Sequence, residues 1–312
     1  MRSNKAGENH TNGRLALLVP GGRGQLGSDL ARLGAAYGSV TAPGSAELDI
    51  TAVASVTAAV DALVKSARAD DSRPVVCNAA AYTAVDAAED DTDRAEAINA
   101  TGPALLAAVC ASRGVPLLHV STDYVFPGDA RKPYEPDDPT GPRSVYGRTK
   151  LAGERAVLTG TDQSWVVRTA WVYGAAGSNF VRTMAKLGNT RPELSVVDDQ
   201  RGSPTWSADL AGGLLELAGK AVEGSGPDHR VLHCTGGGET TWFGLAQAVF
   251  AELGMDPERV KPCTTADFPR PAPRPAYSVL ADTTWRTAGL TPLRPWREAL
   301  TEFVAQHRDQ LV

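Results

Sequence analysis

A tyrosine and a lysine four residues apart, Tyr146 and Lys150 in the segment YGRTK, have the types and spacing for proton transfer. On a helix, this spacing places both side chains on one face. A tyrosine with an ordinary pKa of about 10 is a poor proton donor at neutral pH. A neighbouring ammonium stabilises the phenolate and lowers the tyrosine pKa, and it can also hold the ribose hydroxyls of a nicotinamide cofactor. The pair predicts an acid–base group, although Tyr-x-x-x-Lys alone also arises by chance in ordinary helices.

A second polar cluster lies upstream of this pair, in the segment STDYVF that begins at Ser121. It follows an apolar run that we expect to be a strand, and ligands of open parallel sheets bind at the carboxyl ends of the strands. The hydroxyl of Thr122 would polarise a substrate carbonyl there while Tyr146 protonates it. Asn99, in a long helical stretch, is a weaker candidate for anchoring a water that relays protons to Lys150, because a helix asparagine is more commonly a hydrogen-bonded polar residue without such a role.

Three glycines, Gly21, Gly24 and Gly27, form a G-x-x-G-x-x-G turn between an apolar run and a helical segment. Glycine permits a tight turn and a close approach of the backbone to a pyrophosphate. The helix that follows offers free N–H groups and a positive dipole end to that anion. A glycine triplet alone is weak evidence, but its position after the first expected strand favours a dinucleotide site over a simple turn.

The residues near this turn favour NADPH as the cofactor, with NADH left open. An NAD site usually places a carboxylate about 20 residues beyond the glycines, and the segment SVTAPGSA in that region has no acidic residue. Arg23 lies inside the turn, where its guanidinium would pair with a 2′-phosphate; the alternative is that it points into solvent. Asp49 and Ile50 would close over the adenine, unless Asp49 instead caps the helix that follows.

The composition is that of an ordinary globular protein and excludes several classes of function. The 312 residues carry a formal net charge of −5, which gives no basic surface for nucleic acid. No uncharged apolar run reaches the roughly 18 residues of a membrane span. Residues 1–13 are polar and lack the apolar region of a secretory signal, so we expect a disordered lead-in. The four cysteines are far apart, which fits reduced thiols in a cytoplasmic protein and no metal site.

Short apolar runs alternate with helical segments over the first half of the chain. Expected strands cover residues 15–19, 39–41, 74–78, 115–121 and 165–169, and expected helices cover 25–33, 51–67, 92–113 and 146–158. Strands that alternate with crossover helices imply a parallel sheet with both faces covered. The pattern therefore predicts an α/β protein with a doubly wound Rossmann sheet.

The alternation loosens after Thr169. We expect helices over 179–187, 207–219, 241–253 and 295–307, strands near 195–198 and 230–234, and an extended proline-rich loop over 264–276. The predicted organisation is a dinucleotide-binding domain over 14–170, completed by about 205–235, and a smaller interleaved α/β lobe. That lobe, formed by 171–204 and 236–312, would bind the substrate.

Several segments resemble the dTDP-4-dehydrorhamnose reductases, which are extended short-chain dehydrogenases. Besides the glycine turn, these are NAAAYTAVDAAE, STDYVF, YGRTKLAGE, RTAWVYG, NFVRTM, VVDDQRGSPT and PRPAYSVL. The similarity runs from about residue 14 to residue 307, and the combination of STDYVF, YGRTK and RTAWVYG is specific. The resemblance implies NADPH-dependent reduction of the C4 keto group of dTDP-4-dehydrorhamnose to dTDP-L-rhamnose.

The resemblance also implies roles for individual residues. Tyr146 would be the proton donor with Lys150 as its partner, and Thr122 and Asp123 would bind the sugar. The indole face of Trp171 would pack against the pyranose, unless Trp171 is simply a core residue. The cofactor side would be formed by Gly24, Gln25 and Leu26 at the pyrophosphate and by Ala81, Tyr82 and Thr83 beside the nicotinamide, with Asn179 and Gln200 as weaker candidates for nucleotide contacts.

Two features bear on the substrate and on assembly. Gly141-Pro142 stands where the family often has asparagine-proline, and a loop difference of this kind can change the sugar that is accepted. Some family members dimerise around Mg²⁺ held by carboxylates. Asp29 is a candidate ligand, although it is more simply explained as an acid in the first turn of a helix, where the helix dipole favours negative charge. We therefore assign no metal site and expect a monomer or a homodimer.

Three other functions compete with this reading. Another sugar-nucleotide 4-ketoreductase, of a secondary-metabolite pathway, would have the same Thr, Tyr and Lys. A non-catalytic dinucleotide-binding subunit, like the regulatory subunit of methionine adenosyltransferase, would need none of them. An epimerase or dehydratase of this fold shares Tyr-x-x-x-Lys, but dehydratases generally have Asp-Glu after the threonine. Here Thr122 precedes Asp123-Tyr124, which disfavours dehydration and suits Asp123 as an acceptor for a sugar hydroxyl.

Overall fold

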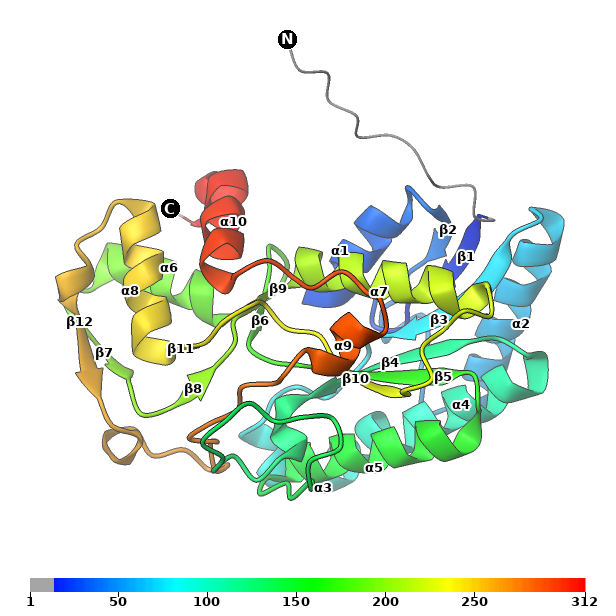
Figure 1. Cartoon of the computed structure of the whole chain (residues 1–312), viewed down its shortest axis with the longest axis horizontal. Coiled ribbons are helices and arrows are strands. Elements are labelled where there is room, and N and C mark those ends of the chain that lie inside the picture. The colour runs from blue at the N-terminus through cyan, green and yellow to red at the C-terminus, as the bar shows by residue number, and fades with distance from the viewer. Residues whose placement is uncertain (1–13, 312) are drawn as a thin grey trace, which may run out of the picture.

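Parallel strands form the centre of the molecule in the computed structural model, which describes residues 14–311 (Figure 1). The predicted lead-in over 1–13 lies outside these residues. Within them, a six-stranded sheet has the order β10-β5-β4-β3-β1-β2, and all neighbouring pairs are parallel. Its strands are β1 (Leu15–Leu18), β2 (Gly38–Thr41), β3 (Arg73–Asn78), β4 (Leu117–Thr122), β5 (Ser164–Thr169) and β10 (Val231–His233). The strand order reverses between β1 and β3, and such a switch point is where open α/β sheets bind ligands.

Helices cover both faces of this sheet, because alternate strand residues are apolar on both sides. Leu15 and Leu17 of β1 pack toward α1 (Gln25–Gly34) and α7 (Ser207–Val222). Ala16 and Leu18 face the opposite layer of α2 (Val53–Ala69), α4 (Gly102–Arg113) and α5 (Val145–Gly160). Figure 1 shows α1 and α7 above β4 and β5, and α4 and α5 below them. The prediction of a doubly wound Rossmann sheet is confirmed.

A second apolar core lies at the other end of the molecule, on the left of Figure 1. Its large buried side chains include Tyr173, Trp206, Phe250 and Phe303. The helices are α6 (Phe180–Thr190), α8 (Trp242–Leu253) and α10 (Trp296–Leu311). Three two-stranded sheets complete it: β6 (Val172–Tyr173) with β9 (Thr205–Trp206), β7 (Leu194–Val197) with β12 (Val260–Cys263), and β8 (Arg201–Gly202) with β11 (Thr240–Thr241).

The expected helix over 92–113 is interrupted. It divides into α3 (Thr92–Glu96), a π-helical turn (Ala97–Thr101) and α4. The expected strands and the other expected helices are present, with ends that differ by a few residues. The sequence did not predict β6, β8, β9, β11, β12 or α9 (Thr283–Thr287), which are two to five residues long. Periodicity carries little information over so few residues.

The proline-rich loop follows the prediction except at its start, where Thr265–Asp267 forms a 3-10 turn. Pro275, near the end of this loop, packs against Gly128. Gly128 has a φ of +81°, and a Cβ there would be 2.4 Å from the proline ring. The loop is therefore held against the segment that follows STDYVF. Among residues 14–311, the structure has no helix that is both long enough and apolar enough to cross a membrane.

Candidate active site

One cavity of about 870 Å³ runs along the carboxyl ends of β1, β3, β4 and β5. Apart from the weaker candidate Asn179, the residues that the sequence suggested for the cofactor or the substrate line it: Gly21, Arg23, Gly24, Gln25, Leu26, Gly27, Asp49, Ile50, Ala81, Tyr82, Thr83, Thr122, Asp123, Tyr146, Lys150, Trp171 and Gln200. Its volume lies within the range of small-molecule and cofactor sites. The cavity extends from the glycine turn to the tyrosine and lysine, so a single bound molecule can reach both.

The glycine turn forms the floor at one end of the cavity. Gly21 has a φ of +79°, and a Cβ on Gly27 would lie 2.2 Å from the Gly21 carbonyl oxygen, so the turn closes only with glycine at these positions. A Cβ on Gly24 would meet only that same oxygen, at 3.3 Å. Gly24 caps α1 without a side-chain hydrogen bond, which leaves first-turn N–H groups free for an anion.

The rim beside the glycine turn carries an ion pair. Arg23 Nη2 lies 2.8 Å from Glu47 Oε1, and Glu47 Oε2 accepts a hydrogen bond from the Gly44 amide at 2.7 Å. These bonds from Gly44 and Arg23 lower the pKa of Glu47. Arg23 is thus not simply free in solvent, and it lines the cavity while holding a carboxylate partner.

Asp49 does not cap α2, so that alternative is wrong. The N-cap of α2 is Ala52. Asp49 Oδ1 instead accepts hydrogen bonds from the backbone N–H and the hydroxyl of Thr51, at 2.9 and 2.7 Å, and these lower its pKa. Asp49 and Ile50 both line the cavity, with Asp49 fixed in a local turn.

Tight backbone contacts place Tyr146 and Lys150 against the sheet. Ser144 caps α5 by accepting a hydrogen bond from the Gly147 amide at 3.1 Å. A Cβ on Gly147 would lie 2.2 Å from the Tyr124 carbonyl oxygen, and one on Gly153 would lie 2.0 Å from that of Asn99. Small residues at these positions let α5 approach the end of β4 and the π-helical turn closely. Tyr146 and Lys150, one turn apart, then point into the cavity.

The pKa of Tyr146 is not lowered, contrary to the prediction. Burial raises the pKa of Tyr146 to about 12, and the hydrogen bond with the Thr122 hydroxyl acts in the lowering direction. The Lys150 ammonium is directed elsewhere, because its Nζ donates to the Val120 carbonyl oxygen at 2.7 Å and lies 3.4 Å from His119 Nε2. Burial lowers the pKa of Lys150 itself to about 8. The phenol is therefore held protonated, and Thr122 rather than Lys150 is its hydrogen-bonded neighbour.

Thr122 and Asp123 form a polar end to the cavity. Thr122 Oγ1 donates to Asp123 Oδ1 at 2.9 Å and accepts from the Tyr124 amide at 3.2 Å. Asp123 Oδ2 is buried without a hydrogen-bond partner in the described structure, as are the hydroxyls of Ser121 and Thr169, and all three residues line the cavity. Burial raises the pKa of Asp123 to about 6. Buried polar atoms without partners are rare in native proteins and mark this end as a place for a polar ligand.

Asn99 has a different role from the one predicted. Its Oδ1 accepts from the Tyr82 amide at 2.8 Å, and its Nδ2 donates to the Tyr82 carbonyl and to Thr149 Oγ1 at 3.1 and 3.2 Å. Both ends of the amide are engaged, so Asn99 holds the loop of Ala81–Thr83 rather than a water beside Lys150. It lies in the π-helical turn, a feature that often accompanies functional sites.

Two tryptophans form an aromatic wall of the cavity. The indole rings of Trp171 and Trp242 are stacked, with centroids 3.5 Å apart and 5° between their planes. Trp171 has a φ of +49°, and its ring lies against Gly202, where a Cβ would be 2.3 Å from Cε2. Trp242 Nε1 donates to Gln200 Oε1 at 3.2 Å, and Gln200 also lines the cavity. Trp171 is thus part of an aromatic pair, and the sequence analysis did not identify Trp242.

Asn179 is not among the residues that line the cavity. It caps α6 by accepting from the Arg182 amide at 3.0 Å, and it donates to Gln25 Oε1 at 2.9 Å. Asn179 therefore holds the side chain of Gln25, which does line the cavity, from the start of α6. Arg94, which no motif indicated, and Pro275, which lies in the segment PRPAYSVL but was given no role, also line the cavity. The fold brings these two residues to it from α3 and from the proline-rich loop.

Comparison with known proteins agrees with this geometry. Residues 15–309 match the family model described as the RmlD substrate binding domain. The chain belongs to this family. A dTDP-4-dehydrorhamnose reductase of Streptomyces griseus is 50% identical to this RmlD-family chain over 290 residues, which is 91% of each protein. A probable dTDP-4,6-dihydroxy-2-methyloxan-3-one 4-ketoreductase of Streptomyces antibioticus is 49% identical over 288 residues, 91% of this chain and 93% of the relative.

A solved structure matches the fold of the RmlD-family chain over nearly its whole length. The dTDP-4-dehydrorhamnose reductase of Bacillus anthracis, solved in complex with NADP, superposes with a TM-score of 0.85 at 33% identity. The match covers 95% of this chain and all of that one. The resemblance found in the sequence is therefore confirmed at the level of the family and the fold.

Asp29, the candidate metal ligand, has protein partners in this family member. Its Oδ1 accepts from Arg32 at 2.7 Å and its Oδ2 from the Ser207 hydroxyl at 2.5 Å, which ties α1 to α7. Over residues 14–311, no group of three or more His, Cys, Asp or Glu side chains is arranged to hold a metal ion. Asp29 is accordingly explained by helix packing.

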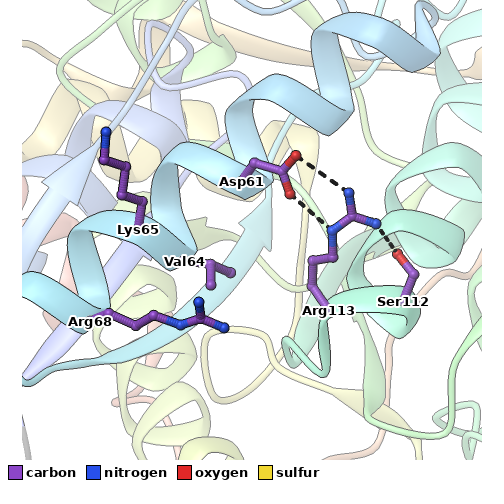
Figure 2. A pocket seen from close by; sticks show the side chains of 6 residues that line it. All are labelled: Asp61, Val64, Lys65, Arg68, Ser112 and Arg113. Atoms are coloured by element: carbon purple, nitrogen blue, oxygen red, sulfur yellow. Dashed lines mark hydrogen bonds and ion pairs between the residues drawn. The ribbon is translucent and has the colours of Figure 1, made fainter.

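A second hollow of about 510 Å³ lies on the surface between α2 and α4 (Figure 2). Arg113 there donates to both carboxylate oxygens of Asp61, at 2.9 and 3.3 Å, and to the Ser112 hydroxyl. Lys65 and Arg68 extend in different directions in Figure 2. Asp61 and Ser112 are thus engaged with Arg113, and the hollow holds none of the residues that the sequence suggested for catalysis.

Proposed function

We propose that this chain reduces the C4 keto group of dTDP-4-dehydrorhamnose with NADPH and forms dTDP-L-rhamnose. The observation that carries the proposal is the placement of Tyr146, Thr122 and Lys150 in the same cavity as the glycine turn. A carbonyl reductase needs a proton donor beside the carbonyl and a cofactor whose reactive ring reaches the same carbon. The cavity supports only the class of reaction, and the relatives that are named as reductases supply the choice of sugar.

The cavity fits a dinucleotide on its own evidence. The glycine turn leaves room where a Cβ on Gly24 would point, next to the free N–H groups of α1. Gly24, Gln25 and Leu26 would hold the pyrophosphate, Asp49 and Ile50 the adenosine, and Ala81, Tyr82 and Thr83 the nicotinamide side. Arg23 would take the 2′-phosphate. When bound, NADPH supplies the hydride that is added to the keto carbon.

Tyr146 would then protonate the substrate oxygen. A phenol with a pKa near 12 is fully protonated at neutral pH, and it is a stronger acid than the alcohol being formed, so transfer to a developing alkoxide is favourable. Thr122 can donate its hydroxyl proton to the carbonyl oxygen once it releases Asp123. Lys150 lies one helix turn away, and as an ammonium it would stabilise the phenolate that Tyr146 leaves behind until a proton returns to the phenol.

The sugar would lie between the polar end and the aromatic wall of the cavity. Asp123 Oδ2, which has no partner in the described structure, would accept a sugar hydroxyl. The edge of the Trp171–Trp242 pair would cover the apolar face of the pyranose. We assign substrate binding to the lobe formed by 171–204 and 236–312, because Trp171 and Trp242 both come from it. Cofactor binding belongs to 14–170, with about 205–235 completing that domain.

Reduction of a different keto-sugar is the second candidate, favoured by the Streptomyces antibioticus relative at 49% identity. Both reactions use the same donor groups, and only the loops around the sugar would differ. A purified-enzyme assay with each dTDP-4-keto-sugar and NADPH separates them, because the natural substrate should have the highest kcat/KM. We further propose that the protein works in the cytoplasm, consistent with its four free cysteines.

Tyr146→Phe tests whether this chemistry is used at all. The variant keeps the ring that packs edge-on against Tyr124, at 5.5 Å between centroids, and removes only the hydroxyl. We expect kcat to fall by about 10² or more, with NADPH affinity retained. Turnover at the wild-type rate would contradict the proposal and would favour a dinucleotide-binding subunit without catalysis.

A further inference from the structure

A buried chain of polar groups ends at Lys150 and is not explained by substrate or cofactor binding. The Ala80 amide donates to Asn78 Oδ1 at 3.1 Å, Asn78 Nδ2 lies 3.0 Å from His119 Nδ1, and His119 Nε2 lies 3.4 Å from Lys150 Nζ. Asn78 and His119 are directly opposite each other in the parallel pairing of β3 with β4. Asn78, His119 and Lys150 are each at most 1% exposed. Asn78 and His119 are therefore shielded from water, and Lys150 is the member of the chain that lines the cavity.

The direction of each hydrogen bond in this chain is fixed from its backbone end. A backbone N–H can only donate, so the oxygen of the Asn78 amide must face Ala80. The Asn78 nitrogen then faces His119, and since an amide nitrogen also only donates, His119 Nδ1 must be an acceptor. Burial, with the charge of Lys150, lowers the pKa of His119 well below its ordinary value, so the ring is neutral. A neutral ring with an unprotonated Nδ1 carries its proton on Nε2.

We propose that Asn78 fixes the Nε2–H tautomer of His119 and that His119 thereby presents a hydrogen-bond donor to Lys150 Nζ. An ammonium has only donors, so Lys150 in its charged form faces another donor at this contact. The neutral amine has a lone pair and accepts the His119 N–H while one of its own N–H groups remains on the Val120 carbonyl. His119 is thus a positioning residue that shifts Lys150 toward the neutral amine, and this inference rests on the role proposed for Lys150 beside Tyr146.

The other groups that face Lys150 do not reverse this effect. Glu154, one turn later on α5, acts to raise the pKa of Lys150, but its carboxylate is held by Arg168 through bonds of 2.9 and 2.8 Å. Tyr146, one turn earlier, is neutral as a phenol. His119 Nε2 is thus the one of these groups that a change of tautomer would convert from a donor to an acceptor toward Lys150.

A lysine that loses its proton easily suits the step after reduction. Once Tyr146 has given its proton to the substrate oxygen, a phenolate remains. By way of water in the cavity, a Lys150 N–H bond then breaks and a Tyr146 O–H bond forms, and the amine that is left accepts from His119 Nε2–H. Solvent water returns the proton to Lys150 before the next turnover. His119 therefore stabilises the form of Lys150 that exists after the transfer.

The tautomer can be measured without cofactor or turnover. Long-range ¹H–¹⁵N NMR spectra of the full-length protein labelled in its five histidines distinguish Nδ1–H, Nε2–H and doubly protonated rings. The signal of His119 is identified by its loss in His119→Leu. We expect a neutral ring protonated on Nε2 from pH 6 to pH 9. A ring protonated on Nδ1, or on both nitrogens, overturns the inference.

A second measurement asks whether the tautomer acts on Lys150. In Asn78→Asp, the carboxylate accepts from the Ala80 amide as before and also accepts from His119 Nδ1–H, which leaves Nε2 as an acceptor for the ammonium. We expect the upper limb of the kcat–pH profile to move to higher pH by about one unit. In Asn78→Asp combined with His119→Leu, most of that shift should disappear relative to His119→Leu alone. If the shift persists in the double variant, the new charge acts directly and His119 does not mediate it.

His233→Leu is the matched control. His233 is equally buried, and its Nδ1 contacts the Ala281 carbonyl oxygen at 3.1 Å, away from Lys150. We expect its pH profile to be that of the wild type. The control therefore separates a general effect of losing a buried histidine from loss of the contact between His119 and Lys150. The two proposals fail separately: full activity of Tyr146→Phe contradicts the reduction mechanism, whereas an Nδ1–H tautomer contradicts only the role of His119.

Discussion

Arg23 and Glu47 form an ion pair at the rim of the cavity, with Nη2 of the arginine 2.8 Å from Oε1 of the glutamate. Arg23 is the cation that would take the 2′-phosphate of NADPH, so in this structure it already has an anionic partner. Glu47 is also bonded to the Gly44 amide and does not turn away freely. A 2′-phosphate would meet the negative charge of Glu47, whereas the 2′-hydroxyl of NADH would not be repelled by it. We therefore expect the pair to moderate the preference for NADPH.

Removing the charge of Glu47 should increase discrimination between the two cofactors. In Glu47→Gln, the side chain keeps an oxygen for the Gly44 amide but no longer repels phosphate. We expect the ratio of kcat/KM for NADPH to that for NADH to rise about two- to fivefold, the range expected from an exposed ion pair. Asp61→Asn, which breaks the surface pair with Arg113 in Figure 2, is the control and should leave the ratio unchanged. An unchanged ratio in Glu47→Gln would contradict the role of Glu47.

Loss of the second indole should weaken substrate binding without affecting the cofactor. Trp242 lines the cavity and supports Trp171 by stacking, so Trp242→Leu removes half of the aromatic wall. We expect the KM for the sugar nucleotide to rise about three- to tenfold, as for loss of one aromatic contact, with the Kd for NADPH unchanged. Phe180 also contacts Trp242 but does not line the cavity, so Phe180→Leu should have a smaller effect. Equal effects of both variants would mean that Trp242 acts only through packing.

Two alanine substitutions in the glycine turn should have opposite consequences. Gly24 lines the cavity and has a φ of −78°, which alanine adopts, and a Cβ there would meet only the Gly21 carbonyl oxygen, at 3.3 Å. Gly24→Ala should therefore unfold at nearly the wild-type temperature and bind NADPH at least about tenfold more weakly, because its methyl occupies the place of the pyrophosphate. Gly27→Ala places a Cβ 2.2 Å from a carbonyl oxygen and should lower Tm by several degrees. Calorimetric titration and thermal unfolding of both variants test this contrast.

Much of the fold and of the cavity lining was predictable because the signals are local. The run LALLV, the three glycines and the helix after them each have a pattern that depends only on neighbouring residues. The same holds for Tyr146 and Lys150, whose spacing predicts a shared helix face. These features position most of the cavity, since the carboxyl ends of parallel strands meet along one edge of the sheet.

What the sequence did not reveal depends on contacts between distant segments. The partner of Arg23 is Glu47, 24 residues away, and nothing in the local pattern indicates that they meet. Trp242 stacks on Trp171 from a segment far along the chain. Asn99 bonds to Tyr82 from a π-helical turn that periodicity does not foresee. The raised pKa of Tyr146 results from burial, which a sequence does not specify. In each case the missing information was three-dimensional.

The buried carboxylate of Asp123 should cost stability at neutral pH. Burial raises the pKa of Asp123 from 3.8 to about 6, so folding favours its protonated form. The stability that this group contributes is fully present below a pH of about 4 and is lost as the pH rises through about 6. The difference between the two pKa values corresponds to about 3 kcal/mol of the free energy of unfolding as an order of magnitude, because the group is only 3% exposed. The carboxylate of Asp123 would thus be kept for substrate binding although its charge lowers the free energy of unfolding.

Asp123→Asn tests this, because asparagine keeps the acceptor for Thr122 and cannot ionise. Relative to the wild type, we expect the variant to gain up to about 3 kcal/mol of unfolding free energy at pH 8 and little at pH 4, since the wild-type carboxyl is protonated there as well. Its kcat/KM for the sugar nucleotide should fall at least about tenfold, because one amide nitrogen replaces an acceptor with a donor. Urea unfolding at both pH values and steady-state kinetics measure the two effects. A gain in stability that is the same at pH 4 and pH 8 would show that the charge of Asp123 is not its cause.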